Sequence, residues 1–293
     1  MGGLDRPQEV LAEVCAVVGL DPSGAHLLKF TNNAAFRLAT APVVARIAGS
    51  RAVRERIMTV VQVARWFAEN GIPAARLMDG IEQPIRIGGH AATLWEYVPS
   101  TGPPPTGGDL GHILRRIHAL PQPPFDLPKW DPIPRFRTRI NDAEGLPSAD
   151  REWLLERCDE ISDELAHLDF ALEPGVVHGD PFLGNLISGR DGPVICDFDG
   201  VSHGPREWDL TPVAVGKLRM DYVTDAHTPL ADSYGFDIMG WPGFATLRRL
   251  RELQLVTSVL PVLRSNPRIR RQWEHRYRTL RSGDLYTRWS TYR

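Results

Sequence analysis

The chain has 293 residues, of which 42% are hydrophobic and 24% charged, and its formal net charge is −2 at pH 7. These values are typical of a globular protein and exclude a disordered, collagen-like or disulfide-built chain. The cysteines Cys15, Cys158 and Cys196 lack metal-binding spacing, so we expect reduced thiols in a cytoplasmic protein. The sequence shows neither a signal-peptide pattern nor an apolar run of the roughly 18 residues that a membrane span needs.

Charge is unevenly distributed along the chain. Residues 150–199 contain 13 acidic residues and 3 arginines, whereas residues 248–293 contain 12 arginines and 3 acidic residues. A basic segment of this kind can bind RNA or a membrane surface. We favour an arginine-rich helical face that pairs with acidic helices nearby, and we therefore expect no nucleic-acid partner and no membrane association.

The first hundred residues show a mixture of helical and strand patterns. The predicted elements are a helix over 7–19, strands over 26–30, 35–39 and 43–47, a helix over 51–70, and strands over 83–87 and 92–98. Turn residues separate the first three strands, which favours a small antiparallel meander.

A segment rich in proline and glycine, residues 99–108, follows these elements and is the best candidate for a junction. Beyond it the pattern is mainly helical. We predict helices over 108–119, 149–168, 206–220 and 243–288 with breaks, a loop over 121–134, and one strand pair formed by 175–178 and 193–197. The fold class is therefore α+β, with a small N-terminal lobe over 1–98, a hinge over 99–107 and a larger, mainly helical lobe over 108–293.

One motif carries residues suited to chemistry. The segment reads His178-Gly-Asp180-Pro-Phe-Leu-Gly-Asn185 and has the spacing H-x-D-x₄-N. Kinase catalytic loops have this spacing, with the aspartate as the base and the asparagine as a metal ligand. Phosphoryl transfer needs both groups, because a base must orient the attacking hydroxyl and a metal must neutralise the phosphates.

A second motif, Asp197-Phe-Asp199, begins twelve residues after Asn185 and directly follows the apolar residues 194–196. An aspartate at the end of an apolar strand occupies the place of the kinase aspartate that holds metal. The two motifs, in this order and at this separation, predict ATP-dependent phosphoryl transfer with Mg²⁺, which prefers oxygen ligands.

Together with Gly204-Pro-Arg-Glu-Trp-Asp209-Leu, these motifs resemble the aminoglycoside phosphotransferase and choline kinase superfamily. The resemblance implies a bilobal protein-kinase-like fold. Its small antiparallel-sheet N-lobe, residues 1–98, would bind the nucleotide, and its larger, mainly helical C-lobe, residues 108–293, would be the catalytic and acceptor-binding lobe. The resemblance also implies that Asp180 is the catalytic base, that Asn185 and Asp197 hold Mg²⁺, and that Asp199 assists at the metal or at the substrate. Asp209 would brace the catalytic loop through hydrogen bonds, and His178 would have a structural role.

The same resemblance implies how the nucleotide is bound. The segment Thr93-Leu-Trp-Glu96-Tyr-Val98-Pro resembles the family's hinge, whose backbone binds adenine, and Arg46 occupies the place of a basic residue that touches the phosphates. Asn33 lies in the expected phosphate-covering turn, where the family often has glycine. The family pairs its basic residue with a helix glutamate near position 60, but this chain has Val60, with Glu55 as the nearest substitute.

Two other functions fit parts of the pattern. The departures at Val60 and at the phosphate-covering turn leave a catalytically inactive nucleotide-binding protein open. The segment Asp197-Phe-Asp199-Gly200 also resembles the nucleophile motif of haloacid-dehalogenase phosphatases, which normally opens a doubly wound sheet.

The predicted acceptor is a small hydroxylated molecule, such as an aminoglycoside-like antibiotic, an amino sugar or an amino alcohol. Acidic residues in 206–285 would suit a cation: Glu207, Asp221, Asp225, Asp232, Asp237 and Glu252. The alternative is that most of these acids are solvated surface groups, and the sequence does not predict the oligomeric state.

Overall fold

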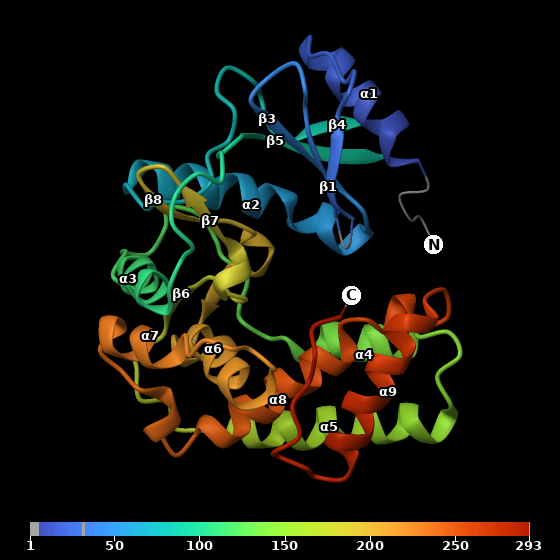
Figure 1. The fold of residues 1–293 in the computed structure, drawn as a ribbon, viewed down its shortest axis with the longest axis vertical. Helices are drawn as coiled ribbons and strands as arrows, with labels where there is room; N and C mark the ends of the chain where they lie inside the picture. The colour runs from blue at the N-terminus through green and yellow to red at the C-terminus, as the bar shows by residue number, and fades with distance from the viewer. Residues whose placement is uncertain (1–5, 31–32, 293) are drawn as a thin grey trace. The chain divides into compact units, whose positions relative to one another are not determined.

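The computed structural model describes residues 6–30 and 33–292, without the side chains of 51–52. The chain forms two compact units (Figure 1). Unit 1 comprises Met1–Pro105, Ala119–Pro128 and Gly184–Ser202, and unit 2 comprises Thr106–His118, Lys129–Leu183 and His203–Arg293. The first boundary between the units lies inside the predicted hinge.

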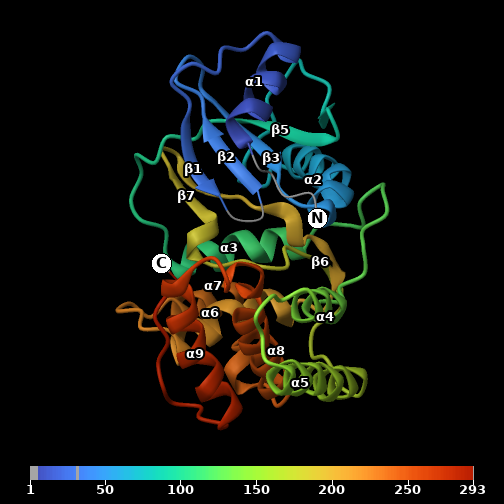
Figure 2. The ribbon, with the colours of Figure 1, turned by 90° about the vertical axis from the view of Figure 1, so that its right-hand side faces the viewer.

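Unit 1 is built on a five-stranded antiparallel sheet, as predicted, in the order β1-β2-β3-β5-β4. Its elements are α1 (Pro7–Val18), β1 (His26–Phe30), β2 (Asn33–Arg37), β3 (Val43–Ala48), α2 (Arg51–Glu69), β4 (Ile85–Ile87) and β5 (His90–Glu96). Figure 2 shows the first three strands side by side. Gly19, in the left-handed conformation with φ 70°, ends α1 as the sequence indicates.

The two faces of this sheet bury different groups, because successive side chains of a strand point to opposite sides. Val43, Ala45 and Ile47 of β3 are buried in one cluster with apolar residues of α1. Arg46 lies between them in sequence and therefore projects from the other face. The alternation places one charged side chain of β3 on the face away from α1.

Phe198 anchors the second acidic motif within unit 1. Its side chain is buried, and its ring centroid lies 5.5 Å from that of Phe67 on α2 and 5.8 Å from that of Trp95 on β5. Truncation of a fully buried phenylalanine to alanine destabilises a protein by about 3–5 kcal/mol. The aromatic side chain between the two aspartates therefore fixes the backbone on which both are mounted.

A short hairpin completes unit 1, formed by β7 (Leu186–Gly189) and β8 (Gly192–Ile195). The predicted pairing of 175–178 with 193–197 is wrong, since β8 pairs with β7, while β6 (Gly175–Val177) pairs with β9 (Ser202–Gly204). The strand pattern at 186–189 is weak because it contains serine and glycine, which are depleted in strands or neutral there.

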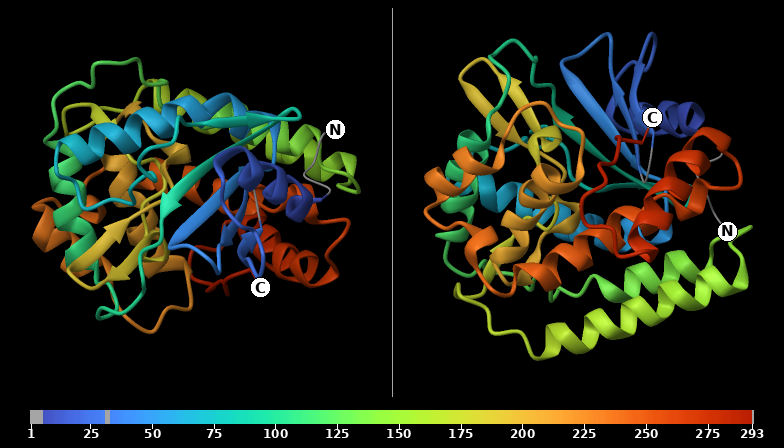
Figure 3. Two further views of the ribbon diagram at one scale, coloured as in Figure 1. Left: turned by 90° about the horizontal axis from the view of Figure 1, so that it is seen from above. Right: turned by 60° about the horizontal axis from the view of Figure 1, so that its bottom comes forward.

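Unit 2 is mainly helical, as predicted. Its helices are α3 (Gly107–His118), α4 (Ile133–Asn141), α5 (Ser148–Ala166), α6 (Glu207–Arg219), α7 (His227–Tyr234), α8 (Phe244–Thr257) and α9 (Pro267–Arg281). The right panel of Figure 3 shows α5 as a long helix beside α4, and α8 packs on α4, α5, α6 and α9. No helix in the described part of the chain is long and apolar enough to cross a membrane.

Helix α4 begins inside the segment predicted as a loop. Pro134 stands in its first turn, where proline is tolerated because that N–H has no helical partner. Ile133, Phe136 and Ile140 follow with helical spacing and are buried. The many prolines of this segment favour a loop, although Pro134 itself marks the first turn of the helix.

The arginine-rich segment pairs with acidic helices, as we favoured. Arg249 pairs with Glu164 of α5, Arg281 with Asp150 of α5, and Arg264 with Glu144. Exposed pairs of this kind contribute roughly 0–1 kcal/mol each. These pairs give three arginines of the segment acidic partners within unit 2.

Trp289 closes the core of unit 2 from a distant part of the sequence. Its side chain is fully buried, and its indole N–H donates to the Thr279 hydroxyl at 2.8 Å. The Arg219 guanidinium lies 4.2 Å from the centre of its ring system. The tryptophan thus covers a buried arginine on α6, which also pairs with Glu252 at 2.9 Å.

Candidate active site

The β7–β8 hairpin brings the predicted metal ligands of unit 1 to one end. Leu186 pairs with Ile195, and the Cys196 N–H donates to the Asn185 carbonyl at 2.9 Å. Asn185, which is buried, and Asp197 therefore flank the open end of the hairpin. Antiparallel pairing of β7 and β8 brings these two residues together, although they are twelve positions apart in the sequence.

Asp197 has an unusual backbone conformation. Its φ of 71° lies in the left-handed region, and among the described residues it is the one non-glycine with positive φ. Such conformations raise the energy by about 1–3 kcal/mol and concentrate at functional sites. The conformation turns the chain between β8 and Phe198 and presents both aspartates on a short turn.

Arg46 from β3 binds both aspartates. Its Nη2 donates to Asp197 Oδ1 at 2.9 Å and to Asp199 Oδ2 at 2.5 Å. The Asn33 side-chain amide, at the start of β2, donates to the same Asp199 oxygen at 3.0 Å. Burial alone would lower the pKa of Arg46, but Asp199 and Asp197 together raise it above its usual value. The predicted residues Arg46, Asn33, Asp197 and Asp199 thus form one cluster in unit 1.

The donor atoms of this cluster fit Mg²⁺. Asp199 Oδ1 is buried and has no hydrogen-bond partner among the described residues, which leaves one carboxylate oxygen available to a cation. Within the same residues, no group of three or more His, Cys, Asp or Glu is placed to hold a metal. Asn185 adds an amide oxygen, and Mg²⁺ commonly takes one or two carboxylates and completes its shell with water and phosphate.

The predicted phosphate-covering turn lies partly beyond what can be described, since Thr31 and Asn32 fall outside the described residues. Val60 is buried in α2 and provides no charge. Glu55 lines a surface cavity of about 580 Å³ with residues of β4 and the turn after it. Arg46 is held by two aspartates of unit 1, Asp197 and Asp199. The resemblance to the family did not indicate this pairing.

The segment after β5 carries the predicted adenine contacts. The Glu96 N–H already donates to the Arg76 carbonyl at 2.9 Å. The Val98 N–H makes no hydrogen bond within the described residues, and a Cβ placed on Gly189 would lie 3.5 Å from Val98 Cγ1. Of the two predicted positions, Val98 keeps its backbone donor available and lies beside the β7–β8 hairpin.

In unit 2, the Asp209 carboxylate organises the first motif. It accepts the His178 N–H at 2.6 Å and the Gly179 N–H at 2.8 Å, and it lies 3.0 Å from His118 Nε2. Gly179 has φ 89°, a conformation that favours glycine. The Trp208 indole donates to the Gly179 carbonyl at 2.8 Å. The N–H and the carbonyl of Gly179, the residue before Asp180, are therefore both held by side chains of α6.

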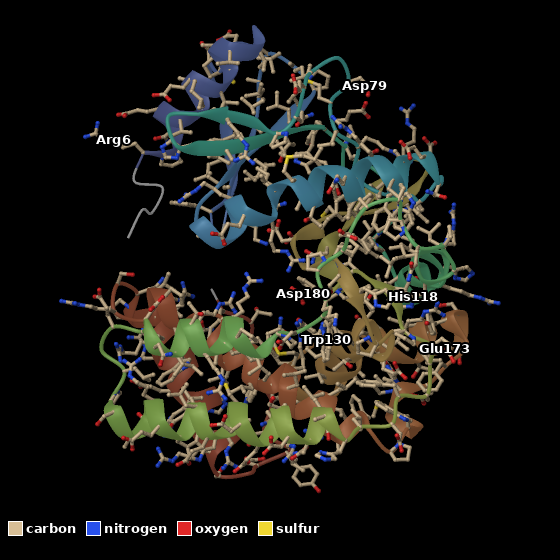
Figure 4. All side chains as sticks on the ribbon, turned by 180° about the vertical axis from the view of Figure 1, so that it is seen from behind. Arg6, Asp79, His118, Trp130, Glu173 and Asp180 are labelled. Atoms are coloured by element: carbon tan, nitrogen blue, oxygen red, sulfur yellow. The ribbon has the colours of Figure 1, made fainter. Side chains whose placement is uncertain are left out.

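Two arginines interact with Asp180, which is labelled with His118 in Figure 4. Arg251 of α8 donates to Asp180 Oδ1 at 2.6 Å, although 43% of the Asp180 side chain remains exposed. Arg139 of α4 also interacts electrostatically with this carboxylate. Neither arginine was predicted, because α8 and α4 carry no motif. His118 lies in a segment that the sequence singles out only as a helix.

The acidic residues proposed for a cationic acceptor have other partners. Asp225 pairs with Lys217, Asp237 with His227, Glu252 with Arg219 and Arg248, and Glu207 accepts the Leu172 N–H. Asp221 and Asp232 are exposed. Most of these acids therefore have structural roles within unit 2.

Comparisons with known proteins agree with this arrangement. Residues 28–253 match the model of the phosphotransferase enzyme family, whereas no curated protein matches the chain. The fold is similar to that of an amicoumacin kinase (TM-score 0.71, 15% identity, covering 96% of this chain and 94% of that one). It is also similar to that of choline kinase from Streptococcus pneumoniae, with a TM-score of 0.67 and 13% identity over 94% of this chain and 98% of that one.

A third solved structure is a choline/ethanolamine kinase family protein from Mesorhizobium loti, with a TM-score of 0.65 and 18% identity over 94% of this chain and 93% of that one. These likenesses confirm the predicted protein-kinase-like fold. Because the family model spans most of the sequence, the chain belongs to the phosphotransferase enzyme family.

Proposed function

We propose that the protein transfers the γ-phosphate of ATP to a hydroxyl group of a small molecule. The observation that carries the proposal is the cluster of Asn185, Asp197 and Asp199 at the open end of the β7–β8 hairpin, with Arg46 bonded to both aspartates. A buried carboxylate oxygen with no partner in the described residues supports a cation there. The amicoumacin kinase was solved with AMP-PNP and Ca²⁺, which is consistent with this chemistry.

Each group would have one task. Asn185 and Asp197 would hold Mg²⁺, which neutralises phosphate charge when bound, and Arg46 would contact phosphate oxygens. Asp180 would accept the proton of the acceptor hydroxyl while the new O–P bond forms and the bond to ADP breaks. Asp209 would hold the loop through the His178 and Gly179 N–H groups. The Val98 backbone, and Glu96 beside it, would meet the adenine.

The finer features of the proposal follow from this chemistry. We place the protein in the cytoplasm, where ATP and Mg²⁺ are available. Its partners would be ATP and a hydroxylated acceptor, with neither nucleic acid nor membrane involved. The predicted acceptors are aminoglycoside-like antibiotics, amino sugars and amino alcohols, and a role in antibiotic resistance would follow from the first of them.

A screen of acceptors tests the proposal. ADP formation would be measured with Mg·ATP and a panel of hydroxylated antibiotics, amino sugars, amino alcohols and hydroxy acids. We expect ADP release that depends on both Mg²⁺ and one acceptor class. Hydrolysis of a generic phosphate monoester without ATP would instead indicate a phosphatase, although Asp197 follows an antiparallel hairpin and not a strand of a doubly wound sheet.

A catalytically inactive nucleotide-binding protein is the second candidate. The observation in its favour is that Val60 stands near the position where the resemblance implies a helix glutamate. In that case Mg·AMP-PNP would bind in a calorimetric titration, but no acceptor would release ADP.

A further inference from the structure

The charge around Asp180 is the opposite of what a cationic acceptor needs. Arg251, on α8, donates to the Asp180 carboxylate at 2.6 Å, and this arginine is itself buried. Arg139, on α4, also interacts with Asp180, and α4 packs on α8. Two guanidinium groups from two packed helices therefore accompany one carboxylate.

Arg135 adds a third positive charge. It lies four residues before Arg139 on α4, and residues at this spacing share one face of a helix. Burial, and then repulsion by Arg135, lower the pKa of Arg139 to about 10, so its guanidinium stays charged at neutral pH. The site at Asp180 carries more positive than negative charge.

Arg139 is also a guanidinium that has been partly removed from water without a hydrogen-bonded partner among the described residues. Its side chain is half-buried, and within the described residues neither Arg135 nor Arg139 makes a side-chain hydrogen bond or ion pair. Other arginines of this unit, such as Arg137 on the same helix and Arg157 on α5, are paired with acids. A half-buried charge is unfavourable unless an opposite charge forms hydrogen bonds with it.

A bound anion would supply that opposite charge. The planar guanidinium matches a carboxylate or phosphate with two parallel hydrogen bonds. An ammonium group placed beside the same arginines would instead be repelled. Of the acids available for a cation, Asp225, Asp237 and Glu252 are already paired.

We propose that the acceptor carries an anionic group, a carboxylate or a phosphate, which binds Arg139 while its hydroxyl faces Asp180. This inference rests on the proposed function and narrows its acceptor class away from amino sugars and amino alcohols. Arg251 holds the Asp180 carboxylate in place and adds to the positive potential that the anion meets.

The test begins with acceptors matched in skeleton and different in charge. ADP formation is measured with 4-hydroxybutyrate, its amide and 4-aminobutanol, and with glycerol 3-phosphate and glycerol, alongside the panel described above. We expect the highest kcat/KM with an anionic member, and the two series distinguish carboxylate from phosphate. A cationic or neutral compound as the best acceptor overturns the inference and leaves the kinase assignment intact.

The variant Arg139→Gln tests the residue. With the best acceptor we expect its KM to rise at least tenfold, with kcat and the KM for ATP nearly unchanged. The matched control is Arg264→Gln, because Arg264 is exposed and pairs with Glu144. An unchanged acceptor KM in Arg139→Gln, with thermal unfolding like that of the wild type, contradicts the inference.

A binding measurement separates this inference from the kinase proposal. Inorganic phosphate is titrated calorimetrically into protein saturated with Mg·AMP-PNP, so that the nucleotide site is filled. We expect binding in the wild type and in Arg264→Gln, and its loss in Arg139→Gln. Equal binding in all three proteins, or none in the wild type, counts against an anion site at Arg139. The absence of ADP formation with any acceptor counts against the proposed function.

Discussion

The two clusters that contain the motif aspartates, one in each unit, differ in the sign of their net charge. In unit 1, Asp197 and Asp199 share one arginine, Arg46, and one oxygen of Asp199 has no partner among the described residues. In unit 2, the single carboxylate of Asp180 is accompanied by Arg251 and Arg139. Excess negative charge suits a metal cation and excess positive charge suits an anion, and for this reason we propose opposite ligands for the two clusters.

The largest expected effect comes from removing the carboxylate in unit 2. Asp180→Asn should lower kcat about 10²–10⁴-fold, the usual contribution of a general base, because the amide cannot accept the acceptor's proton. Mg·AMP-PNP affinity should stay near that of the wild type. Asp232→Asn is the control, because Asp232 is an exposed residue of α7. Near-normal turnover in Asp180→Asn would exclude Asp180 as the base.

The next effect concerns the negative cluster. Asp197→Asn should weaken Mg²⁺-dependent nucleotide binding at least as strongly as the roughly 10–100-fold loss that follows when groups supporting a metal's ligands are changed. Asparagine tolerates the left-handed conformation, so the fold should be retained. Titrating Mg²⁺ at fixed AMP-PNP measures the loss. Asp197→Ala would add a loss of stability, and unchanged Mg²⁺ affinity in Asp197→Asn would exclude Asp197 as a ligand.

A smaller effect is expected at the support of the Asp180 loop. Asp209→Asn replaces an acceptor of two backbone N–H groups with an amide that has one acceptor oxygen. One buried donor would lose its partner, which destabilises by about 1–3 kcal/mol. Urea unfolding measures this change, with Asp159→Asn on the exposed face of α5 as the control. Equal midpoints for the two variants would contradict the bracing role.

The smallest effect concerns Cys158, which is buried in α5. Burial raises the pKa of its thiol to about 11, and Arg137 only partly opposes this shift. Since the thiolate is the reactive form, roughly one molecule in a thousand would be reactive at pH 8. A chromogenic disulfide reagent should modify Cys158 slowly until urea is added. Rapid reaction in the folded protein would show that burial does not govern this thiol.

The negative cluster of unit 1 could be predicted from the sequence better than the positive cluster of unit 2, because short segments define it. Asn185 and Asp197 stand at the ends of strands that pair directly, so short segments define their positions, and Arg46 lies on a strand whose alternation is visible. Arg139 precedes Asp180 by more than 40 residues in the sequence, and Arg251 follows it by more than 70. Only helix packing brings these arginines together, and no motif records it.

The buried Trp289 has a consequence for how the protein is made. Its ring covers Arg219, which is 70 residues earlier in the chain. During synthesis, N-terminal regions fold first. The Arg219 side chain would therefore lack its contact with Trp289 until residue 289 had left the ribosome. Unit 1, whose last segment ends at Ser202, can close its sheet much earlier. A nascent chain halted before residue 289 would therefore expose an incomplete unit 2 to chaperones and proteases, beside a unit 1 that is already complete.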